Sequence, residues 1–172
     1  KILMVIFMIL GLGLAAGCGG SAASPTPAKS TAQQQASLSG KKVLIAYFSW
    51  SGNTKAAAEK IQGLTGGDIY RIEAADPYPG EYDATTDRAK QEQKDNARPA
   101  IAGKADLSKY DVIMVGYPIW WYQEPMIIDT FLESGDFSGK TIVPFCTSGG
   151  SSIDKSIEHM KTVVKGASFA QG

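Results

Sequence analysis

The sequence has no excess of charge of either sign. Its 17 Lys and Arg residues balance 17 Asp and Glu residues over 172 positions, and no block is rich in Lys and Arg. Proteins that bind nucleic acid usually carry a basic patch or stripe that neutralises phosphates. We therefore expect no nucleic-acid partner, and the charge balance gives no support for electrostatic steering toward a charged partner.

Cysteine and histidine are scarce, with two copies and one copy respectively. Cys146 lies inside an apolar run with no histidine near it in sequence, so we interpret it as a small core residue rather than a nucleophile. His159 stands among charged neighbours on an expected helix, which favours a solvated surface position. On this basis we predict neither a catalytic side chain nor a metal site.

The turn at residues 49–54 lacks the lysine of the ATP-binding loop and the GxGxxG spacing of dinucleotide sites. It follows the apolar run 43–48, which is typical of a strand buried on both faces, and it precedes a helical pattern at 55–61. Between them lie several hydroxyl groups, backbone N–H groups freed by Gly52, and the positive end of a helix dipole. Together these groups predict a site for an anion such as phosphate.

The first 18 residues are typical of a secretory signal. A basic residue precedes an apolar run too short to span a membrane comfortably, and small residues come directly before Cys18. This end resembles a bacterial lipobox, in which Cys18 becomes the lipidated N-terminus of the mature protein. The alternative is an ordinary signal peptide or membrane anchor with an incidental cysteine. Lipidation would leave Cys146 without a partner, so we expect no intrachain disulfide.

Residues 19–40 are rich in Ser, Ala, Pro, Thr and Gln and contain almost no large apolar side chain. Such a segment buries too little surface to offset its loss of conformational entropy, so we predict a disordered tether. About 22 flexible residues reach about 25 Å on average. We therefore expect the globular part, residues 41–172, to be held at the extracytoplasmic face of a bacterial membrane.

Apolar runs alternate with helical patterns through the rest of the chain. We expect strands at 43–48, 69–72, 110–117 and 140–146, and helices at 55–61, 83–96, 126–133 and 154–164. Continuous apolar strands that alternate with helices are typical of an open, doubly wound parallel α/β sheet.

Ligands of such sheets bind beyond the carboxyl ends of the strands. Three of the expected strands end there in unusual loops. One loop is rich in hydroxyl groups, one carries two adjacent tryptophans, and one has the sequence Thr-Ser-Gly-Gly-Ser. Together they predict a pocket with an anion cradle, a flat aromatic wall and a flexible loop whose backbone can approach a ring.

These loops resemble those of the flavodoxin family, and the resemblance covers nearly everything after Lys41. It implies the strand order 2-1-3-4-5, a fifth strand that begins within 167–170, and a closing helix for which the chain stops too early, at Gly172. It also implies bound FMN. The implicated loop residues are Ser49, Trp50, Ser51, Gly52, Asn53 and Thr54 in the first loop, Pro118, Ile119, Trp120, Trp121 and Tyr122 in the second, and Thr147, Ser148, Gly149 and Gly150 in the third.

The resemblance also implies a role for each loop. The expected phosphate donors are Ser49, Ser51, Asn53 and Thr54. The third loop is expected to supply backbone contacts to the edge of the flavin ring, and the ring to pack against Trp120 or Trp121. Trp50 is expected to contact the cofactor. Related sequences commonly have glycine in place of Tyr122; glycine tolerates positive φ and lets the adjacent peptide reorient, whereas tyrosine resists this.

The leading hypothesis is an FMN-binding electron-transfer protein tethered outside the bacterial membrane, with a redox protein or a small-molecule acceptor as its partner. The first alternative is an NAD(P)H-dependent FMN or quinone reductase. Tyr122 favours this alternative. Reorientation of the peptide beside the flavin stabilises the one-electron semiquinone, and a tyrosine would resist it. A two-electron enzyme needs no stable semiquinone. The second alternative is a cofactor-free lipoprotein that keeps the fold as a binding scaffold.

Overall fold

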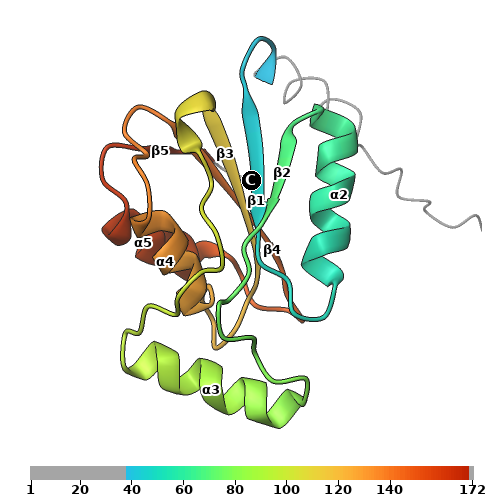
Figure 1. Ribbon diagram of the computed structural model, residues 1–172, viewed down its shortest axis with the longest axis vertical. Coiled ribbons are helices and arrows are strands. Elements are labelled where there is room, and N and C mark those ends of the chain that lie inside the picture. Colours follow the sequence, from blue (N-terminus) through green and yellow to red (C-terminus); the bar gives the residue numbers. More distant parts are fainter. Residues whose placement is uncertain (1–37, 171–172) are drawn as a thin grey trace, which may run out of the picture.

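The structure is a computed structural model that describes residues 38–170, so the expected signal, the lipidated Cys18 and most of the expected tether lie outside the described residues. Five strands form one sheet in the order β2-β1-β3-β4-β5 (Figure 1). All neighbouring strands are parallel. The doubly wound sheet and its strand order, both expected from the sequence, are confirmed.

The elements follow the expected order along the chain. The strands are β1 (Val43–Tyr47), β2 (Asp68–Arg71), β3 (Val112–Pro118), β4 (Thr141–Thr147) and β5 (Ser168–Phe169). The helices are α2 (Asn53–Thr65), α3 (Tyr82–Lys94), α4 (Met126–Glu133) and α5 (Asp154–Val163), with a short 3-10 helix, η1, at Leu107–Lys109. Helix α2 is longer than expected at both ends, and it stops where Gly66 takes a left-handed φ of 68°.

Two apolar clusters cover the two faces of the sheet. On one face, Ala58 of α2 packs with Ile45 of β1. On the other face, Ile127 of α4 and Met160 of α5 belong to a larger cluster with Leu44. Figure 1 shows α2 on one side of the sheet and α4 with α5 on the other. Because β1 lies between β2 and β3 and is covered on both faces, all five of its residues are buried, as its unbroken apolar run predicts.

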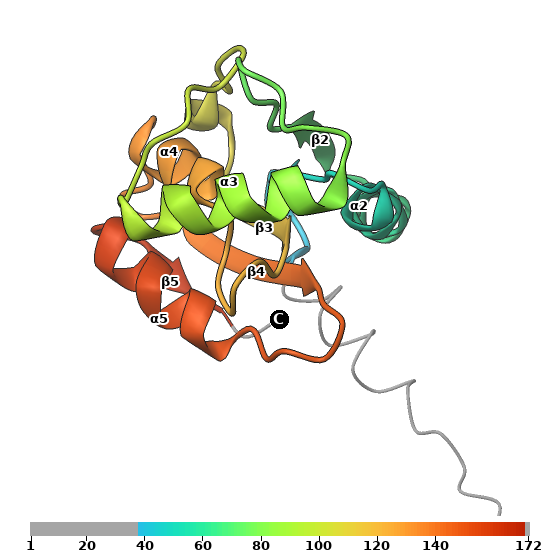
Figure 2. The ribbon, with the colours of Figure 1, turned by 90° about the horizontal axis from the view of Figure 1, so that it is seen from below.

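Helix α3 lies on neither face. It runs across the carboxyl-terminal edge of the sheet (Figures 1 and 2). Its sequence is strongly polar, and only Thr85 and Ala89 are buried. The Tyr78 hydroxyl donates to Glu92 over 2.7 Å, and the Arg88 guanidinium lies 4.2 Å from the centre of the Tyr78 ring. These contacts hold α3 against the loops at this edge, and burial raises the pKa of Tyr78.

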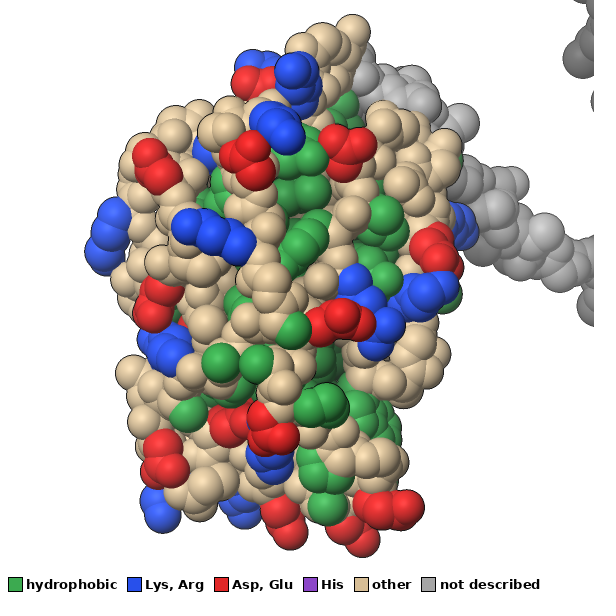
Figure 3. All heavy atoms as spheres, in the orientation of Figure 1, with side chains coloured by type: hydrophobic (Ala, Val, Ile, Leu, Met, Phe, Trp, Pro, Cys, Tyr) green, Lys and Arg blue, Asp and Glu red, His purple; other side chains and the backbone are tan. Residues whose placement is uncertain are grey.

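The described chain begins with a turn at residues 38–40, closed by a 3.0 Å hydrogen bond from the Lys41 N–H to the Leu38 carbonyl. Leu38 packs against the cluster that contains Ile45. None of the helices in the described part of the chain combines the length and apolar character needed to cross a bilayer. On the face shown in Figure 3, acidic and basic side chains are interspersed.

Candidate functional site

The first loop presents the positive end of α2 at the carboxyl end of β1. Gly52 caps the helix with a φ of 92°, and its N–H donates to Ser49 Oγ over 3.1 Å. The first helical hydrogen bond runs from the Ala56 N–H to the Gly52 carbonyl. The N–H groups of residues 53–55 therefore have no partner within the helix. No acidic side chain lies in the first turn, so the loop has the geometry and charge of an anion cradle.

The four expected phosphate donors divide into two kinds. Ser51 and Asn53 are exposed and open to a ligand. Ser49 and Thr54 are buried, with 7% and 1% of their surface exposed. The Thr54 hydroxyl already pairs with the Thr147 hydroxyl at 2.8 Å, so it connects the first loop to the third. We conclude that Ser49 and Thr54 shape the cradle, while Ser51, Asn53 and the backbone N–H groups face outward.

Trp50 is fixed at the border between the first loop and α3. Its indole N–H donates to the Pro79 carbonyl over 2.8 Å, and the Thr85 hydroxyl donates to the same oxygen over 2.6 Å. The Tyr82 ring lies 6.4 Å away, centre to centre. Trp50 therefore forms one wall of the site, and it is held there by the loop that contains Pro79 and by α3.

The two adjacent tryptophans occupy different environments. Trp120 packs edge-on against Phe48 and Tyr78, with ring centres 5.4 and 5.2 Å away. Trp121 is 40% exposed, and its indole N–H donates to the Thr86 carbonyl of α3 over 3.1 Å. Trp120 is thus fixed by packing against neighbouring rings, and Trp121 connects the second loop to α3 through its hydrogen bond.

The second loop is a two-residue hairpin turn. Trp120 and Gln123 exchange backbone hydrogen bonds of 2.9 and 3.2 Å. The central residues, Trp121 and Tyr122, have φ values of 49° and 72°. Positive φ at both central positions is the mark of a type I′ turn, where Asn-Gly is strongly preferred. Tyr122 nevertheless adopts the conformation that we expected glycine to tolerate and tyrosine to resist.

The third loop is braced by one serine. Ser148 Oγ accepts hydrogen bonds from the N–H groups of Gly150 and Ser151, at 3.1 and 2.7 Å. Gly150 has a φ of 141°, which a side chain would rarely adopt. The Ile119 N–H donates to the Thr147 carbonyl over 2.9 Å, so the second and third loops start side by side.

The three loops and α3 enclose a cavity of about 280 Å³. Its lining is rich in aromatic side chains and in small polar groups. The lining residues are Trp50, Tyr82, Thr85, Thr86, Ala89, Ile119, Trp120, Trp121, Tyr122 and Ser151. Four of them, from Tyr82 to Ala89, belong to α3 and were not expected from the sequence, because the helical pattern at 83–96 carries no sign of the surface it faces. Gly149 lies in the third loop and Pro118 is the last residue of β3, and neither lines this cavity.

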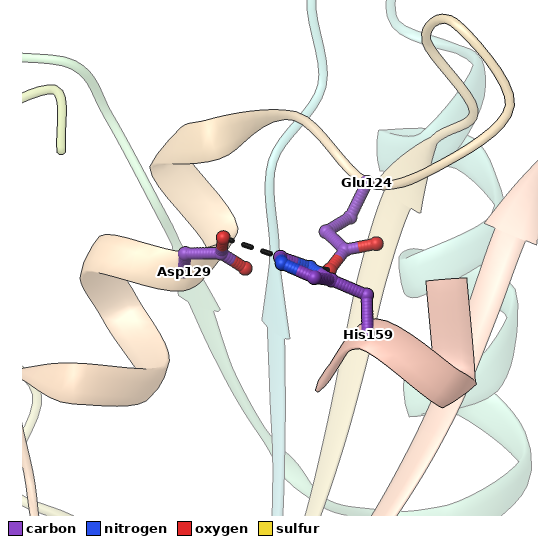
Figure 4. Close-up of side chains that lie close together, drawn as sticks. All are labelled: Glu124, Asp129 and His159. Carbon is purple, nitrogen blue, oxygen red and sulfur yellow. Dashed lines mark hydrogen bonds and ion pairs between the residues drawn. The ribbon is translucent and has the colours of Figure 1, made fainter. Parts of the chain in front are cut away.

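The expectation for His159 is corrected by the structure. Its side chain is only 31% exposed, and its Nδ1 lies 2.7 Å from Glu124 Oε1 and 3.7 Å from Asp129 Oδ2 (Figure 4). The charged neighbours in sequence suggested a solvated side chain. Helix α5 instead turns the imidazole inward, toward two buried carboxylates contributed by other segments. By contrast, Cys146 packs against the core as expected, and burial raises the pKa of its thiol.

Comparisons with known proteins agree with this geometry. Residues 42–172 match the family described as flavodoxin. The fold and its three loops thus define a flavodoxin-like α/β protein, and the chain belongs to the flavodoxin family. Among curated proteins, it is 29% identical over 136 residues to the minor allergen Alt a 7 of Alternaria alternata. That match covers 72% of this chain and 65% of the allergen, so it spans just under two thirds of that relative.

Solved structures are similar over most of the described domain. A protein of Bacteroides eggerthii described as a flavoprotein is 43% identical, with a TM-score of 0.72, over 77% of this chain and 86% of that one. Another from Bacteroides uniformis is 40% identical, with the same TM-score, over 77% and 88% of the two chains. A flavoprotein of Lactobacillus acidophilus, solved in complex with FMN, is 27% identical with a TM-score of 0.67, over 76% and 91%.

Proposed function

We propose that this protein binds FMN and transfers electrons. The observation that carries the proposal is the anion cradle at the start of α2, in the same loop as Trp50, which lines the aromatic cavity. A flavin mononucleotide needs both features, a phosphate site and a flat apolar slot, within the length of one molecule. The FMN complex of the Lactobacillus acidophilus relative supports the same assignment.

The residues of this chain fit such a ligand. The unpaired N–H groups at residues 53–55, with Ser51 and Asn53, would hold the phosphate, and no carboxylate in the first turn of α2 opposes it. The aromatic wall that includes Trp120 and Trp121 would orient the ring. The third loop would offer backbone groups to the ring edge through Gly149 and Gly150. Bound FMN supplies the redox chemistry, and the chain binds it, orients it and excludes water.

We propose that the site works outside the cell, held at the membrane by a lipid on Cys18 through residues 19–40. The support for this proposal is the signal-like N-terminus and the composition of the segment after it. The partner would be a redox protein or a small electron acceptor. Interspersed charges on the face in Figure 3 favour recognition by shape rather than by a single charged patch.

A second candidate function is that of a reductase that accepts hydride from NAD(P)H. Its specific support is the exposure of Trp121 and Tyr122, 40% and 64%, beside the cavity. Two exposed aromatic rings at the mouth of a flavin site can stack on a second planar ring.

The first experiment is an absorption spectrum of the protein purified with FMN supplied and then desalted. Flavin bands that survive desalting support the proposal. A folded, colourless protein that ignores added FMN would overturn both redox functions and leave a cofactor-free scaffold. Anaerobic addition of NADPH then separates the two redox candidates, because rapid bleaching without a separate reductase identifies the enzyme and an unchanged spectrum identifies the carrier.

The location is tested separately. Replacing the lipidated residue, Cys18→Ser, is expected to move the protein from the membrane fraction to the soluble fraction when the natural gene is expressed in a bacterium. The matched control is Cys146→Ser, which removes the other thiol and is expected to leave the protein in the membrane fraction. Equal membrane recovery of the wild type and the Cys18→Ser variant would contradict the anchor.

A further inference from the structure

A second polar centre lies among α4, α5 and the segment that follows the second loop. It consists of Glu124, Asp129 and His159, which offer one ligand atom each within 4.8 Å of one another (Figure 4). None of the three lines the cavity described above. Glu124 and Asp129 have 1% and 0% of their surface exposed, so both carboxyl groups are withdrawn from water.

The two carboxylates of this centre differ in their hydrogen bonds. His159 Nδ1 pairs with Glu124 Oε1 at 2.7 Å. Within the described residues, neither carboxylate oxygen of Asp129 has a hydrogen-bond partner, although both are buried. In Figure 4 the Asp129 carboxylate points toward the imidazole. A buried carboxylate without a donor costs free energy unless a cation lies beside it.

The neighbouring arginine does not meet this need. Arg98 Nη1 lies 3.7 Å from Asp129 Oδ2, beyond hydrogen-bond distance. Its Nε and Nη2 donate to the two carboxylate oxygens of Glu133 at 2.8 Å each. Its Nη1 donates to backbone and side-chain oxygens of Asn96, at 3.0 and 2.9 Å. The charge of Arg98 is therefore shared with Glu133 and offsets that of Asp129 only in part, while Glu124 and Asp129 face a single imidazole.

We propose that Glu124, Asp129 and His159 bind a divalent transition-metal ion of the zinc type. Two carboxylate oxygens and one imidazole nitrogen are a three-ligand set that such an ion accepts, with water in the fourth position. The ligand atoms of a tetrahedral zinc ion lie about 3.3 Å apart, given metal–ligand bonds of about 2.0–2.2 Å. The present separations from His159 Nδ1, 2.7 and 3.7 Å, bracket that value, and all three ligand atoms lie within 4.8 Å of one another, so the ion would bind after side-chain movements that even out these distances.

The surroundings have the features of a supported metal site. The Ser156 hydroxyl donates to Glu124 Oε2, the oxygen that does not face His159. Ser156 Oγ also lies 2.7 Å from the Tyr117 hydroxyl, so its position is fixed from β3. Hydrogen bonds of this kind orient metal ligands. The partly exposed His159 leaves the centre open to solvent on one side, which provides a path for the ion and its water.

The ligand types also indicate which ions bind. An imidazole suits zinc, nickel or cobalt, whereas magnesium prefers a shell of oxygen atoms and keeps most of its water. We therefore expect Zn²⁺ to bind and Mg²⁺ at the same concentration to give no signal. The bound ion would link Glu124, at the end of the second loop, to α4 and α5, and would raise the melting temperature of the protein.

The test is calorimetric titration of the purified, chelator-treated protein with Zn²⁺ alone. We expect one equivalent to bind, and Asp129→Asn and His159→Gln each to weaken binding by about tenfold or more. Ser156→Ala, which removes the hydrogen bond to Glu124 and the contact with Tyr117 but no ligand atom, is expected to weaken it by about tenfold. The matched control is Glu158→Gln, which removes an exposed carboxylate next to His159 on the same helix and leaves binding unchanged.

Each result decides for or against the site. Circular dichroism of each variant establishes that it is folded, and the near-isosteric Asp129→Asn change keeps the shape of the centre. Absence of Zn²⁺ binding to the wild type would overturn the proposal. So would binding that Asp129→Asn and His159→Gln leave as tight as in the wild type, because the ion would then lie elsewhere. Neither result depends on FMN, so the outcome is independent of the redox function.

Discussion

Thr54 Oγ1 and Thr147 Oγ1 lie 2.8 Å apart, although the two residues are 93 positions apart in sequence. The first stands at the start of α2 and the second at the end of β4. Thr54 is 1% exposed and Thr147 is half-buried, so the bond is partly shielded from water. This pair joins the loop that is proposed to hold phosphate to the loop that is proposed to border the flavin ring.

The first prediction concerns this pair. Thr54→Val keeps the shape of the side chain but removes the hydroxyl, and we expect it to lower the free energy of unfolding by about 1 kcal/mol. Thr147→Val should cost a similar amount. The double variant should lose clearly less stability than the sum of the two single losses, because both changes remove the same hydrogen bond. Urea unfolding of the four proteins measures the coupling, and strict additivity would show that the bond contributes nothing.

The second prediction compares two glycines. A Cβ on Gly116 of β3 would lie 2.1 Å from Cζ of Phe145, whereas a Cβ on Gly63 of α2 meets nothing within 4 Å. We expect Gly116→Ala to lower the free energy of unfolding by about 1–3 kcal/mol, since the ring must move. Gly63→Ala should raise it by about 0.5–1 kcal/mol through helix propensity. Thermal and urea unfolding check both signs.

The control for Gly116→Ala is a second change at its neighbour. Phe145→Leu, with a smaller side chain, should recover part of the loss when combined with Gly116→Ala. If Gly116→Ala is as stable as the wild type, the half-buried Phe145 ring swings away at no cost, and the close approach of β3 and β4 side chains has no energetic role.

The third prediction tests the anion cradle. Asn53→Asp places a carboxylate in the first turn of α2, where it faces the positive end of the helix. We expect the FMN-free protein to gain about 0.3–1 kcal/mol of stability from this interaction. The same carboxylate would repel the phosphate, so the affinity for FMN should fall by about tenfold or more. Fluorescence titration with FMN and thermal unfolding give the two opposite effects.

The matched control carries the same charge change at a distance from the cradle. Gln62→Glu lies in the last turns of α2 and should leave the affinity for FMN unchanged. Equal losses of affinity in both variants would point to overall charge rather than a local phosphate site. An unchanged affinity in Asn53→Asp would place the phosphate elsewhere.

The sequence predicts well where the strands and the loops after them lie along the chain, because these positions depend on local pattern. The apolar run of β1 is continuous because the strand is covered on both faces. Helix α4 has the bounds expected from its apolar spacing, since its buried face includes Ile127, Ile128 and Phe131. The strand order, by contrast, came from family resemblance, because pairing between strands far apart in sequence leaves no periodic signal in either strand.

Contacts that depend on tertiary packing could not be predicted. Helix α3 reads as a solvated helix, and only its position across the sheet edge turns Thr85 and Ala89 toward the cavity. His159 reads as a surface side chain, because its two carboxylate partners come from segments 30 and more residues earlier. One signal was present: Asp129 interrupts the apolar pattern of α4, and a charge on a buried helix face needs a partner.

The fourth prediction concerns that charge. Burial, together with the nearby negative charge of Glu124, raises the pKa of Asp129 to about 7, while His159 and Arg98 lower it in part. The unfolded chain releases the same proton near pH 4. Between these values the folded protein holds more protons, so stability should fall as the pH rises from about 4 to 7. The loss is complete above that window.

Asp129→Asn cannot ionise and should escape this loss. In the presence of a chelator, we expect the variant to exceed the wild type at pH 8 by at least about 1.4 kcal/mol, the free energy of one pKa unit. The difference should shrink toward pH 4. Urea unfolding across this range measures it, with Asp87→Asn, an exposed aspartate in the middle of α3, as the control. A difference in the free energy of unfolding between variant and wild type that stays constant with pH would show that Asp129 keeps an ordinary pKa.

The fifth prediction concerns the strained turn of the second loop. Tyr122 has a φ of 72° and is 64% exposed, so its side chain pays a conformational cost and gains few contacts in return. A residue with a Cβ in this region costs about 1–2 kcal/mol relative to an ordinary conformation. Tyr122→Gly removes that strain, and we expect it to raise the free energy of unfolding by about 1 kcal/mol even after the added freedom of the unfolded chain.

Tyr122→Ala separates strain from the loss of the ring. It removes the aromatic group, including the contact with Lys155 whose Nζ lies 5.6 Å from the ring centre, but it keeps the Cβ. We therefore expect Tyr122→Ala to be no more stable than the wild type. A variant pair in which glycine and alanine stabilise equally would assign the effect to the exposed ring. If glycine gives no gain at all, the type I′ turn holds Tyr122 without strain, and the tyrosine is compatible with the peptide reorientation that glycine permits.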